Sequence, residues 1–147
     1  MKVVIGSDHA GYKMKENLKK HLKEKNVEVV DVGTNSEESV DYPVFGEKVG
    51  EEVVSKNYDF GIVVCGTGIG ISIAANKVKG VRAALVHDTL TARLAKEHND
   101  ANVLAIGGRN TDFKEAEKIV DAFMDAEFEA RHQRRIDLIS DMEENKK

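Results

Sequence analysis

Five short apolar runs, separated by stretches with helical spacing, constrain the fold of this chain more than any other feature of its sequence. Three of the runs, Val3–Ile5, Ile62–Val64 and Val103–Ile106, contain no polar residue. Strands without polar alternation are covered on both faces, as in a parallel sheet. The other two runs span 27–32 and 81–86. The sequence therefore predicts five strands, and it favours a parallel sheet.

Apolar residues at helical spacing lie between the predicted strands. Met14, Leu18 and Leu22 are four residues apart, which puts them on one face of a helix. Right-handed crossovers would wrap such helices onto both faces of one sheet. We expect an α/β fold, a three-layer α/β/α domain of doubly wound type that occupies residues 1–147 as a single unit. Further stripes of this kind follow at Phe45, Val49 and Val53, at Leu90 and Leu94, and at Phe113, Ala116, Val120 and Phe123.

The composition fits one globular domain and argues against several classes of protein. With 147 residues, of which 41% are hydrophobic, the chain can bury a core of its own. A formal net charge of −4, no Trp, five Phe and three Tyr argue against a nucleic-acid groove, which needs a basic surface with aromatic side chains. A single Cys cannot form an internal disulfide, and no N-terminal apolar run follows a basic segment. We therefore expect a cytoplasmic protein without a membrane segment.

Reactive side chains follow four of the predicted strands. Ligands of doubly wound sheets bind beyond the carboxyl ends of the strands, so we expect the functional site at this edge. The loop from Gly33 to Pro43 is long enough to suggest a lid over it. The side chains are Asp8-His9 after the first strand, Cys65 after the third, His87-Asp88 after the fourth and Gly107-Gly108-Arg109 after the fifth.

The run from Cys65 to Gly70 puts the chain's only cysteine at a predicted strand-to-helix junction. A thiol at a helix N-terminus feels unpaired N–H groups and the positive end of the helix dipole, which favour the thiolate. The glycines let backbone N–H groups close around a substrate oxygen that becomes negative during reaction. The run indicates a nucleophile or base beside an anion hole. The alternative is that Cys65 is a small buried core residue, as most lone cysteines are.

Two glycine-containing segments imitate nucleotide-binding motifs. The dinucleotide fingerprint would need Gly at position 71, where this chain has Ile71. The segment from Gly6 to Lys13 resembles a P-loop, but Met14 replaces the Ser or Thr that would hold magnesium. Neither segment predicts a nucleotide site.

After the fifth strand and its helix, the chain continues with a thin apolar seam among many charges. This seam predicts a final helix at about 126–145. A domain of this size leaves such a helix little to cover, so we expect it to pack on a second subunit. The alternative is a frayed tail, and Lys146 and Lys147 are expected to be disordered. The members of the seam are Phe128, Ile136, Ile139 and Met142.

Five segments spread over nearly the whole chain match one family in order and spacing. They are Asp8-His9-Ala10-Gly11, Asp41-Tyr42-Pro43, the run from Cys65 to Lys77, His98-Asn99-Asp100-Ala101-Asn102, and Arg131-His132 with Arg135. Together they resemble ribose-5-phosphate isomerase B. The resemblance implies a Rossmann-like sheet of order 2-1-3-5-4 in a homodimer or a tetramer of dimers. It also implies interconversion of ribose 5-phosphate and ribulose 5-phosphate without a metal or other cofactor.

The resemblance assigns roles in an enediol mechanism. Cys65 would be the base that moves a proton between neighbouring sugar carbons, which agrees with its predicted place at a helix start. The Thr67 hydroxyl and backbone N–H groups would stabilise the enediolate oxygen. His98, assisted by Asp8, would open the sugar ring, since the unperturbed pKa of histidine lies near neutrality. The N–H donors would come from Gly66, Gly68, Ile69 and Gly70.

The resemblance also assigns substrate-binding residues. Phosphate recognition would fall to His9, Arg131 and Arg135, because guanidinium groups present a planar fork to phosphate oxygens. Arg109 would lie nearby, and Asn99 would hydrogen-bond the sugar hydroxyls. In the family, the segments with the ring-opening histidine and the C-terminal arginines come from the neighbouring subunit. Activity would then require the dimer.

Two departures from the family pattern bear on these roles. One branch of the family uses a Glu as its base where this chain has Ile71, so we expect this chain in the cysteine-dependent branch. Glu129-Ala130 stand where the family commonly has two glycines, which affects the path into the last helix and the aim of Arg131.

Several alternatives stay open. The substrate could instead be a hexose 6-phosphate of allose or galactose, or the chain could be a non-catalytic sugar-phosphate binding protein. A zinc site built from His9, Cys65 and His98 is conceivable, although no short ligand spacing supports it, and we expect no metal. Outside the family context, His98 could simply cap a helix. No catalytic role is assigned to His87 or His132, and His21 is expected at the surface.

Overall fold

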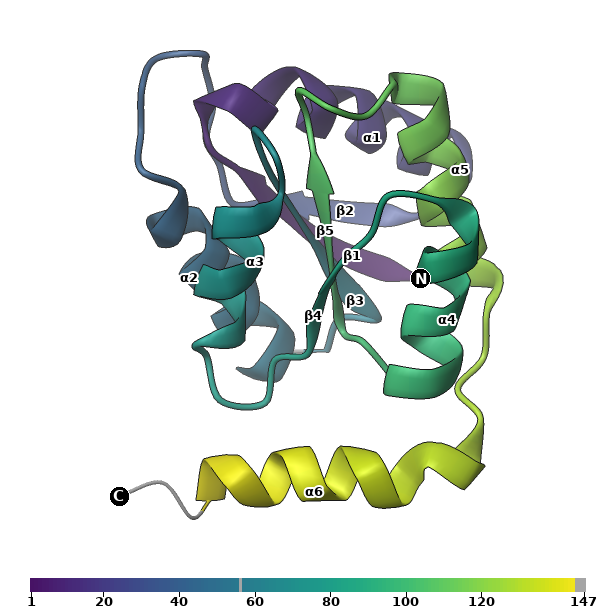
Figure 1. Ribbon diagram of the computed structural model, residues 1–147. Coiled ribbons are helices and arrows are strands. Elements are labelled where there is room, and N and C mark those ends of the chain that lie inside the picture. Colours follow the sequence, from purple (N-terminus) through teal and green to yellow (C-terminus); the bar gives the residue numbers. More distant parts are fainter. Residues whose placement is uncertain (56, 145–147) are drawn as a thin grey trace.

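Five parallel strands form the sheet of this computed structural model, which describes residues 1–55 and 57–144. They lie in the order β2-β1-β3-β5-β4, with β3 in the centre (Figure 1). This finding confirms the predicted parallel sheet and its strand order. The strands are β1 (Lys2–Ser7), β2 (Glu28–Asp31), β3 (Phe60–Cys65), β4 (Ala83–Leu85) and β5 (Val103–Gly107).

Alternate residues of the central strands belong to two separate apolar clusters. Ile62 and Val64 of β3 pack with α1, α4 and α5 on one face of the sheet. Val63 and Cys65 pack with α2 and α3 on the other face. Both faces are therefore covered, which confirms the predicted three layers (Figure 1). The helices are α1 (Tyr12–Glu24), α2 (Tyr42–Ser55), α3 (Ile69–Asn76), α4 (Thr89–Asn99), α5 (Phe113–Asp125) and α6 (Gln133–Glu144), with 3-10 turns η1 (His9–Gly11) and η2 (Ala130–His132).

The two edge strands are shorter than the sequence predicts. β2 spans 28–31 rather than 27–32, and β4 spans 83–85 rather than 81–86. At β4, Asn102 replaces part of the ladder, because its Oδ1 accepts a hydrogen bond from the Arg82 N–H (2.7 Å) and its Nδ2 donates to the Gly80 carbonyl (2.9 Å). An edge strand pairs on one side only, so a side chain can end its ladder early.

Helix α6 lies apart from the three layers, beyond the amino-terminal ends of the strands (Figure 1). It begins at Gln133 rather than near 126, because residues 126–129 run extended past α4, where the Glu129 N–H donates to the Glu97 carbonyl (2.9 Å). Near its other end, the Gly80 N–H donates to the Glu143 carboxylate (2.9 Å).

Only part of the apolar seam of α6 is used within the chain. Ile136 is buried, whereas Leu138, Ile139 and Met142 are exposed. An unpartnered apolar face of this kind is typical of a helix that packs on another molecule. Within residues 1–55 and 57–144, no helix combines the length and the apolarity needed to cross a membrane. The expectation for Lys146 and Lys147 falls outside the described residues.

Candidate active site

The turn after β3 is built around glycine. Gly68 caps α3 with φ of 79°, and a Cβ there would lie 2.6 Å from the Leu85 Cδ1. The turn is fixed to the end of β5, since the Gly108 N–H donates to the Cys65 carbonyl (2.8 Å) and the Arg109 N–H donates to the Gly66 carbonyl (2.9 Å). The helix starts at Ile69 rather than directly behind Cys65, because the chain needs this turn to reverse from strand to helix.

Cys65 is a buried core residue that also stands at the edge of the sheet where the site is expected. Its thiol is free, its residue is only 5% exposed, and it belongs to the apolar cluster beneath α2 and α3. It is also the last residue of the central strand, at the carboxyl edge of the sheet. The sulfur is therefore a buried group directly behind a half-buried turn at Gly66.

The end of β1 lies against the end of β3, as the sheet order requires. The Asp8 N–H donates to the Val64 carbonyl (3.2 Å), and the Asp8 Oδ1 accepts a hydrogen bond from the Gly11 N–H (3.1 Å). Gly11 passes so close to β3 that a Cβ on it would lie 2.5 Å from the Val64 carbonyl oxygen. Asp8 and Cys65 are thus brought to neighbouring strand ends, and the Asp8 carboxylate caps η1.

A cleft of about 410 Å³ opens at this edge. His9, an expected phosphate-binding residue, and Arg109, expected to lie nearby, both line it. The His9 Nδ1 lies 3.1 Å from the Val40 nitrogen and 3.2 Å from the Val40 carbonyl oxygen. A hydrogen bond with either group ties the 33–41 loop to the cleft. Cys65 is not one of the described residues that form its wall, which are His9, Ala10, Lys13, Met14, Glu37, Gly108, Arg109 and Phe113.

Two residues near this cleft received no role from the sequence. The Lys13 ammonium lines the cleft and lies 3.8 Å from the Glu37 carboxylate of the loop. Tyr42 covers the glycine turn, since a Cβ on Gly70 would lie 2.6 Å from its ring. Lys13 follows His9 by one helical turn, and Tyr42 is the first residue of α2. These two positions were the signals from which the sequence could have placed both residues near the site.

The remaining turn residues present polar groups outward. Thr67 and Ile69 are exposed, and Gly66 and Gly70 are half-buried. The Thr67 Oγ1 accepts a hydrogen bond from the Ile69 N–H at 3.2 Å. The first turn of a helix offers N–H groups without intrahelical partners, so this face can accommodate a negative oxygen.

His98 and Asn99 lie at the opposite edge of the sheet from Cys65. α4 begins beyond the carboxyl end of β4 and runs back to the start of β5, so its last residues are at the amino-terminal edge. β3 has six residues, which span about 20 Å at roughly 3.3 Å per residue. Within one chain, the structure therefore does not bring His98, the expected ring-opening residue, close to Cys65.

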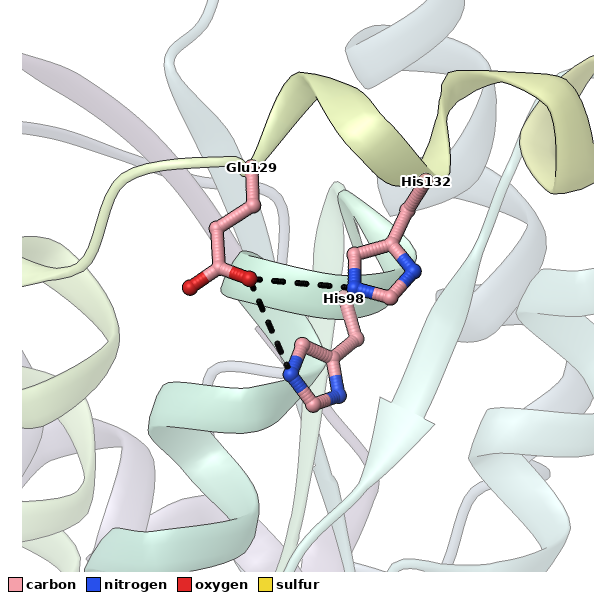
Figure 2. Close-up of side chains that lie close together, drawn as sticks. All are labelled: His98, Glu129 and His132. Atoms are coloured by element: carbon pink, nitrogen blue, oxygen red, sulfur yellow. Dashed lines mark ion pairs between the residues drawn. The ribbon is translucent and has the colours of Figure 1, made fainter.

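Residues from η2 join His98 at this second edge (Figure 2). The His98 and His132 rings have centroids 4.6 Å apart, and the Glu129 Oε1 lies 4.0 Å from the His98 Nε2 and 3.7 Å from the His132 Nε2. Arg131 turns its guanidinium onto the same carboxylate, with its Nη2 at 2.9 Å from Oε1. The departure at Glu129 thus fixes the direction in which Arg131 points.

Burial lowers the pKa of His132, and the nearby cations of Arg131 and Arg135 lower it further. The imidazole is therefore neutral at pH 7.

Three other titratable residues have structural roles. Asp88 caps α4, because its Oδ1 accepts hydrogen bonds from the N–H and the hydroxyl of Thr91 (2.7 Å each), and these bonds lower its pKa. His87 beside it is exposed. His21 is largely covered rather than at the surface, since its Nε2 lies 2.7 Å from an Asp121 carboxylate oxygen of α5.

Comparisons with known proteins identify the family. The family described as Ribose/Galactose Isomerase matches residues 3–139. Ribose-5-phosphate isomerase B of Escherichia coli is 44% identical over 99% of this chain and 98% of its own length. The structure of ribose-5-phosphate isomerase B from Clostridium thermocellum has a TM-score of 0.96 at 52% identity and 98% coverage of both chains. The enzyme from Mycoplasma genitalium, with ribulose 5-phosphate bound, has a TM-score of 0.92 at 45% identity, with 99% of this chain and 97% of that chain covered. This chain therefore belongs to the ribose/galactose isomerase family, among the ribose-5-phosphate isomerases of type B.

Proposed function

We propose that this chain interconverts ribose 5-phosphate and ribulose 5-phosphate through an enediolate, without a metal ion, in the cytoplasm. The observation that carries the proposal is the junction of β1, β3 and β5, where Cys65 and its glycine turn adjoin the cleft of His9 and Arg109. The relative with bound ribulose 5-phosphate, which covers almost the whole chain, supports the same substrate class.

Cys65 acts as the base in this proposal. Its thiolate takes the proton from C2 of the open-chain aldose, and the electron pair of that bond forms the C1–C2 double bond of the enediolate while C1=O becomes an oxyanion. The O2 proton then moves to O1, the O2 electron pair re-forms a carbonyl at C2, and the thiol returns its proton to C1, which regenerates the thiolate. The Cys65 residue is only 5% exposed, so the base acts in a site with little bulk water.

The glycine turn stabilises the negative oxygen. N–H groups from Gly66 to Gly70 and the Thr67 hydroxyl provide donors in a fixed backbone, which loses little energy to rearrangement during the reaction. Gly68, Ile69 and Gly70 form the start of α3, whose dipole adds positive potential at the same point.

Ring opening requires a second subunit in this proposal. His98 opens the furanose with help from Asp8, yet the two lie at opposite edges of the sheet within one chain. A homodimer in which His98 of one copy faces Cys65 of the other satisfies this geometry, and two such dimers could pair further. Asn99 would contact the sugar hydroxyls from the same edge.

Phosphate binding is shared in the same way. His9 and Arg109 supply donors from the cleft, and Arg131 and Arg135 supply guanidinium groups from the second copy. The seam of α6 at Leu138, Ile139 and Met142 supports an extended contact between copies, since these apolar side chains are exposed within the described chain.

Replacement of the base tests the proposal. Cys65→Ala should lower turnover of ribose 5-phosphate about a thousandfold, because general-base catalysis contributes about 10²–10⁴. Folding and binding of ribulose 5-phosphate should be unchanged, as measured by thermal unfolding and calorimetry. His87→Gln, at the same edge, serves as the control and should keep full activity. Near-full activity of Cys65→Ala would refute the assigned base.

A galactose 6-phosphate substrate is the second candidate. A galactose-6-phosphate isomerase subunit of Clostridium acetobutylicum is 47% identical over 87% of this chain and 74% of its own length. Turnover of ribose 5-phosphate, allose 6-phosphate and galactose 6-phosphate, compared with chelator present, separates the candidates and tests metal independence. A non-catalytic binding protein would bind these sugars without exchanging their carbon-bound protons with solvent.

A further inference from the structure

Three ligand atoms converge at the amino-terminal edge of the sheet. His98 lies in the last turn of α4, Glu129 ends the extended 126–129 segment and His132 ends η2, and each offers one atom to a common centre (Figure 2). These atoms lie within 4.8 Å of one another. Two imidazoles and one carboxylate form a donor set that zinc takes in sites with an open fourth position.

His132 carries a second observation that points to a ligand. The residue is 9% exposed, and within the described residues its Nε2 has no hydrogen-bond partner. A buried polar atom without a partner costs free energy, so native structures rarely leave one without a reason. This atom is the one that faces Glu129, at 3.7 Å from Oε1. A metal ion between the two would satisfy it.

The distances require only a small contraction. Zinc binds nitrogen and oxygen at about 2.0–2.1 Å, which puts tetrahedral ligand atoms about 3.3 Å apart. The present separations of 3.7 and 4.0 Å from the Glu129 Oε1 exceed this value by less than 1 Å. His98 and Glu129 are both half-exposed, so their side chains have room to close on an ion.

Arg131 competes with the ion. Its Nε and Nη2 lie 3.1 and 2.9 Å from the Glu129 Oε1, the same oxygen that a metal would use. The Arg131 side chain is exposed and can swing into solvent when a divalent cation takes its place. Metal binding would therefore occupy His98 and release Arg131 in one step.

We propose that His98, Glu129 and His132 form a binding site for zinc or a similar divalent transition-metal ion, and that occupancy inhibits the enzyme. Inhibition rests on the proposed function, because the ion takes the imidazole nitrogen assigned to ring opening. Binding itself does not depend on that function.

Calorimetric titration of chelator-stripped, full-length protein with zinc chloride tests binding directly. One zinc per chain is expected. Glu129→Gln and His132→Gln should each weaken binding about tenfold or more, since even outer-shell changes cost 10–100-fold in metal affinity. His87→Gln and Cys65→Ala should bind within about twofold of the unaltered chain, and the second of these excludes simple capture of zinc by the thiol.

An activity assay with zinc completes the test. Zinc should inhibit the unaltered enzyme, while Glu129→Gln, which keeps His98, should need about tenfold more zinc for the same inhibition. No zinc binding, or binding unchanged by both Glu129→Gln and His132→Gln, would overturn the proposal. Should the chain prove not to isomerise ribose 5-phosphate, the calorimetric result still decides whether the metal site exists.

Discussion

At the scale of the residue, the most unexpected side chain is Lys15. It is fully buried, and its ammonium lies 2.5 Å from the Asp31 carboxylate and 2.9 Å from that of Glu16. Burial raises the pKa of Asp31, but hydrogen bonds from Lys15, Lys19 and the Gly33 N–H outweigh it, so the pKa is lowered. Asp31 ends β2, so this pair fastens α1 to an edge strand.

Removal of one partner of this pair should destabilise the fold. Asp31→Asn leaves the buried ammonium with a single carboxylate, and breaking a buried ion pair costs about 3 kcal/mol. We expect a decrease of this size in the free energy of unfolding, measured by urea denaturation at pH 7. Glu28→Gln is the control on the same strand, because its pair with Lys2 is solvent-exposed and should change stability by less than about 0.5 kcal/mol.

The pair of Lys15 and Asp31 also makes the free energy of unfolding depend on pH in a defined direction. The pKa of Asp31 is lowered on folding, so the unfolded chain binds more protons at acid pH. The stabilisation that ionised Asp31 contributes is complete above the ordinary Asp pKa of about 3.9, and it is lost as the pH falls through the lowered pKa of the folded state. The unfolding free energy of the unaltered chain should fall more steeply below pH 4 than that of Asp31→Asn. Parallel curves would contradict this assignment.

Residue-level prediction from the sequence succeeded where the backbone alone decides position. Asp8, His9 and Arg109 follow parallel strands directly, so their shared edge follows from the topology. The contacts of Lys15 with Asp31 and of His98 with Glu129 depend on how side chains of separate segments meet, and no spacing in the sequence predicts them. Burial of Cys65 was one of two readings and is confirmed, while its role as a base beside an anion hole stays a prediction.

At the scale of the element, glycine permits β1, β3 and β5 to end close together. Gly11 makes the close contact between η1 and β3 possible, because a Cβ at this position would lie only 2.5 Å from the Val64 carbonyl oxygen. The position of Asp8 and His9 relative to Cys65 therefore depends on the absence of a side chain at Gly11.

Gly11→Ala should displace η1 from the end of β3. Overpacking of this kind costs about 1–3 kcal/mol of stability, and a shift of about 1 Å at a reacting group can lower turnover about a hundredfold. We expect both losses, measured by urea denaturation and by initial rates. Gly50→Ala on α2 is the control, since its Cβ meets only valine methyl groups at 3.0–3.2 Å and lies far from the cleft. Unchanged turnover in Gly11→Ala would contradict the dependence of the site on this contact.

The last helix carries the other prediction at this scale. Leu138 is exposed on α6, whereas its neighbour Asp137 bonds to Gln133 within the helix (2.8 Å). If α6 packs on a second copy through its apolar seam, Leu138→Lys should raise the dimer dissociation constant at least about tenfold, as for a central interface residue. Asp137→Lys introduces the same side chain on another face of the helix and should leave it unchanged. Sedimentation velocity at several concentrations measures both, and equal dissociation constants would place the contact elsewhere.

The wholly apolar strands and the helices of the three layers were predictable, because the spacing of their apolar residues matches the side chains that the fold buries. The edge strands were overestimated, since the pattern of apolar residues continues past the point where the Asn102 side chain replaces the ladder. The start of α6 was also misjudged, because residues 126–129 bond as an extended segment to α4, a contact between distant parts of the chain.

At the scale of the whole molecule, the expected site residues divide between two edges of one sheet. Cys65, Asp8, His9 and Arg109 lie at the carboxyl ends of the strands, whereas His98, Arg131 and Arg135 lie beyond the amino ends. The spacing of apolar residues predicts the place of the first set but carries no information about a second molecule. Only the family resemblance suggested that the second set serves a neighbouring subunit, and the six residues of β3 separate the two sets by about 20 Å within one chain.

Subunit complementation tests this division. Cys65→Ala and His98→Asn should each be inactive on ribose 5-phosphate. In a mixed dimer, the Cys65→Ala chain keeps its histidine and the His98→Asn chain keeps its cysteine, so one of the two shared sites is intact. Random pairing makes about half of the dimers mixed, so co-refolded equal amounts should regain about a quarter of the unaltered activity. Co-refolding Cys65→Ala with Cys65→Ser controls for recovery unrelated to pairing and should stay inactive. If the first mixture also stays inactive while mixed dimers are present by mass spectrometry, each site is contained in one chain and the proposed dimer mechanism is wrong.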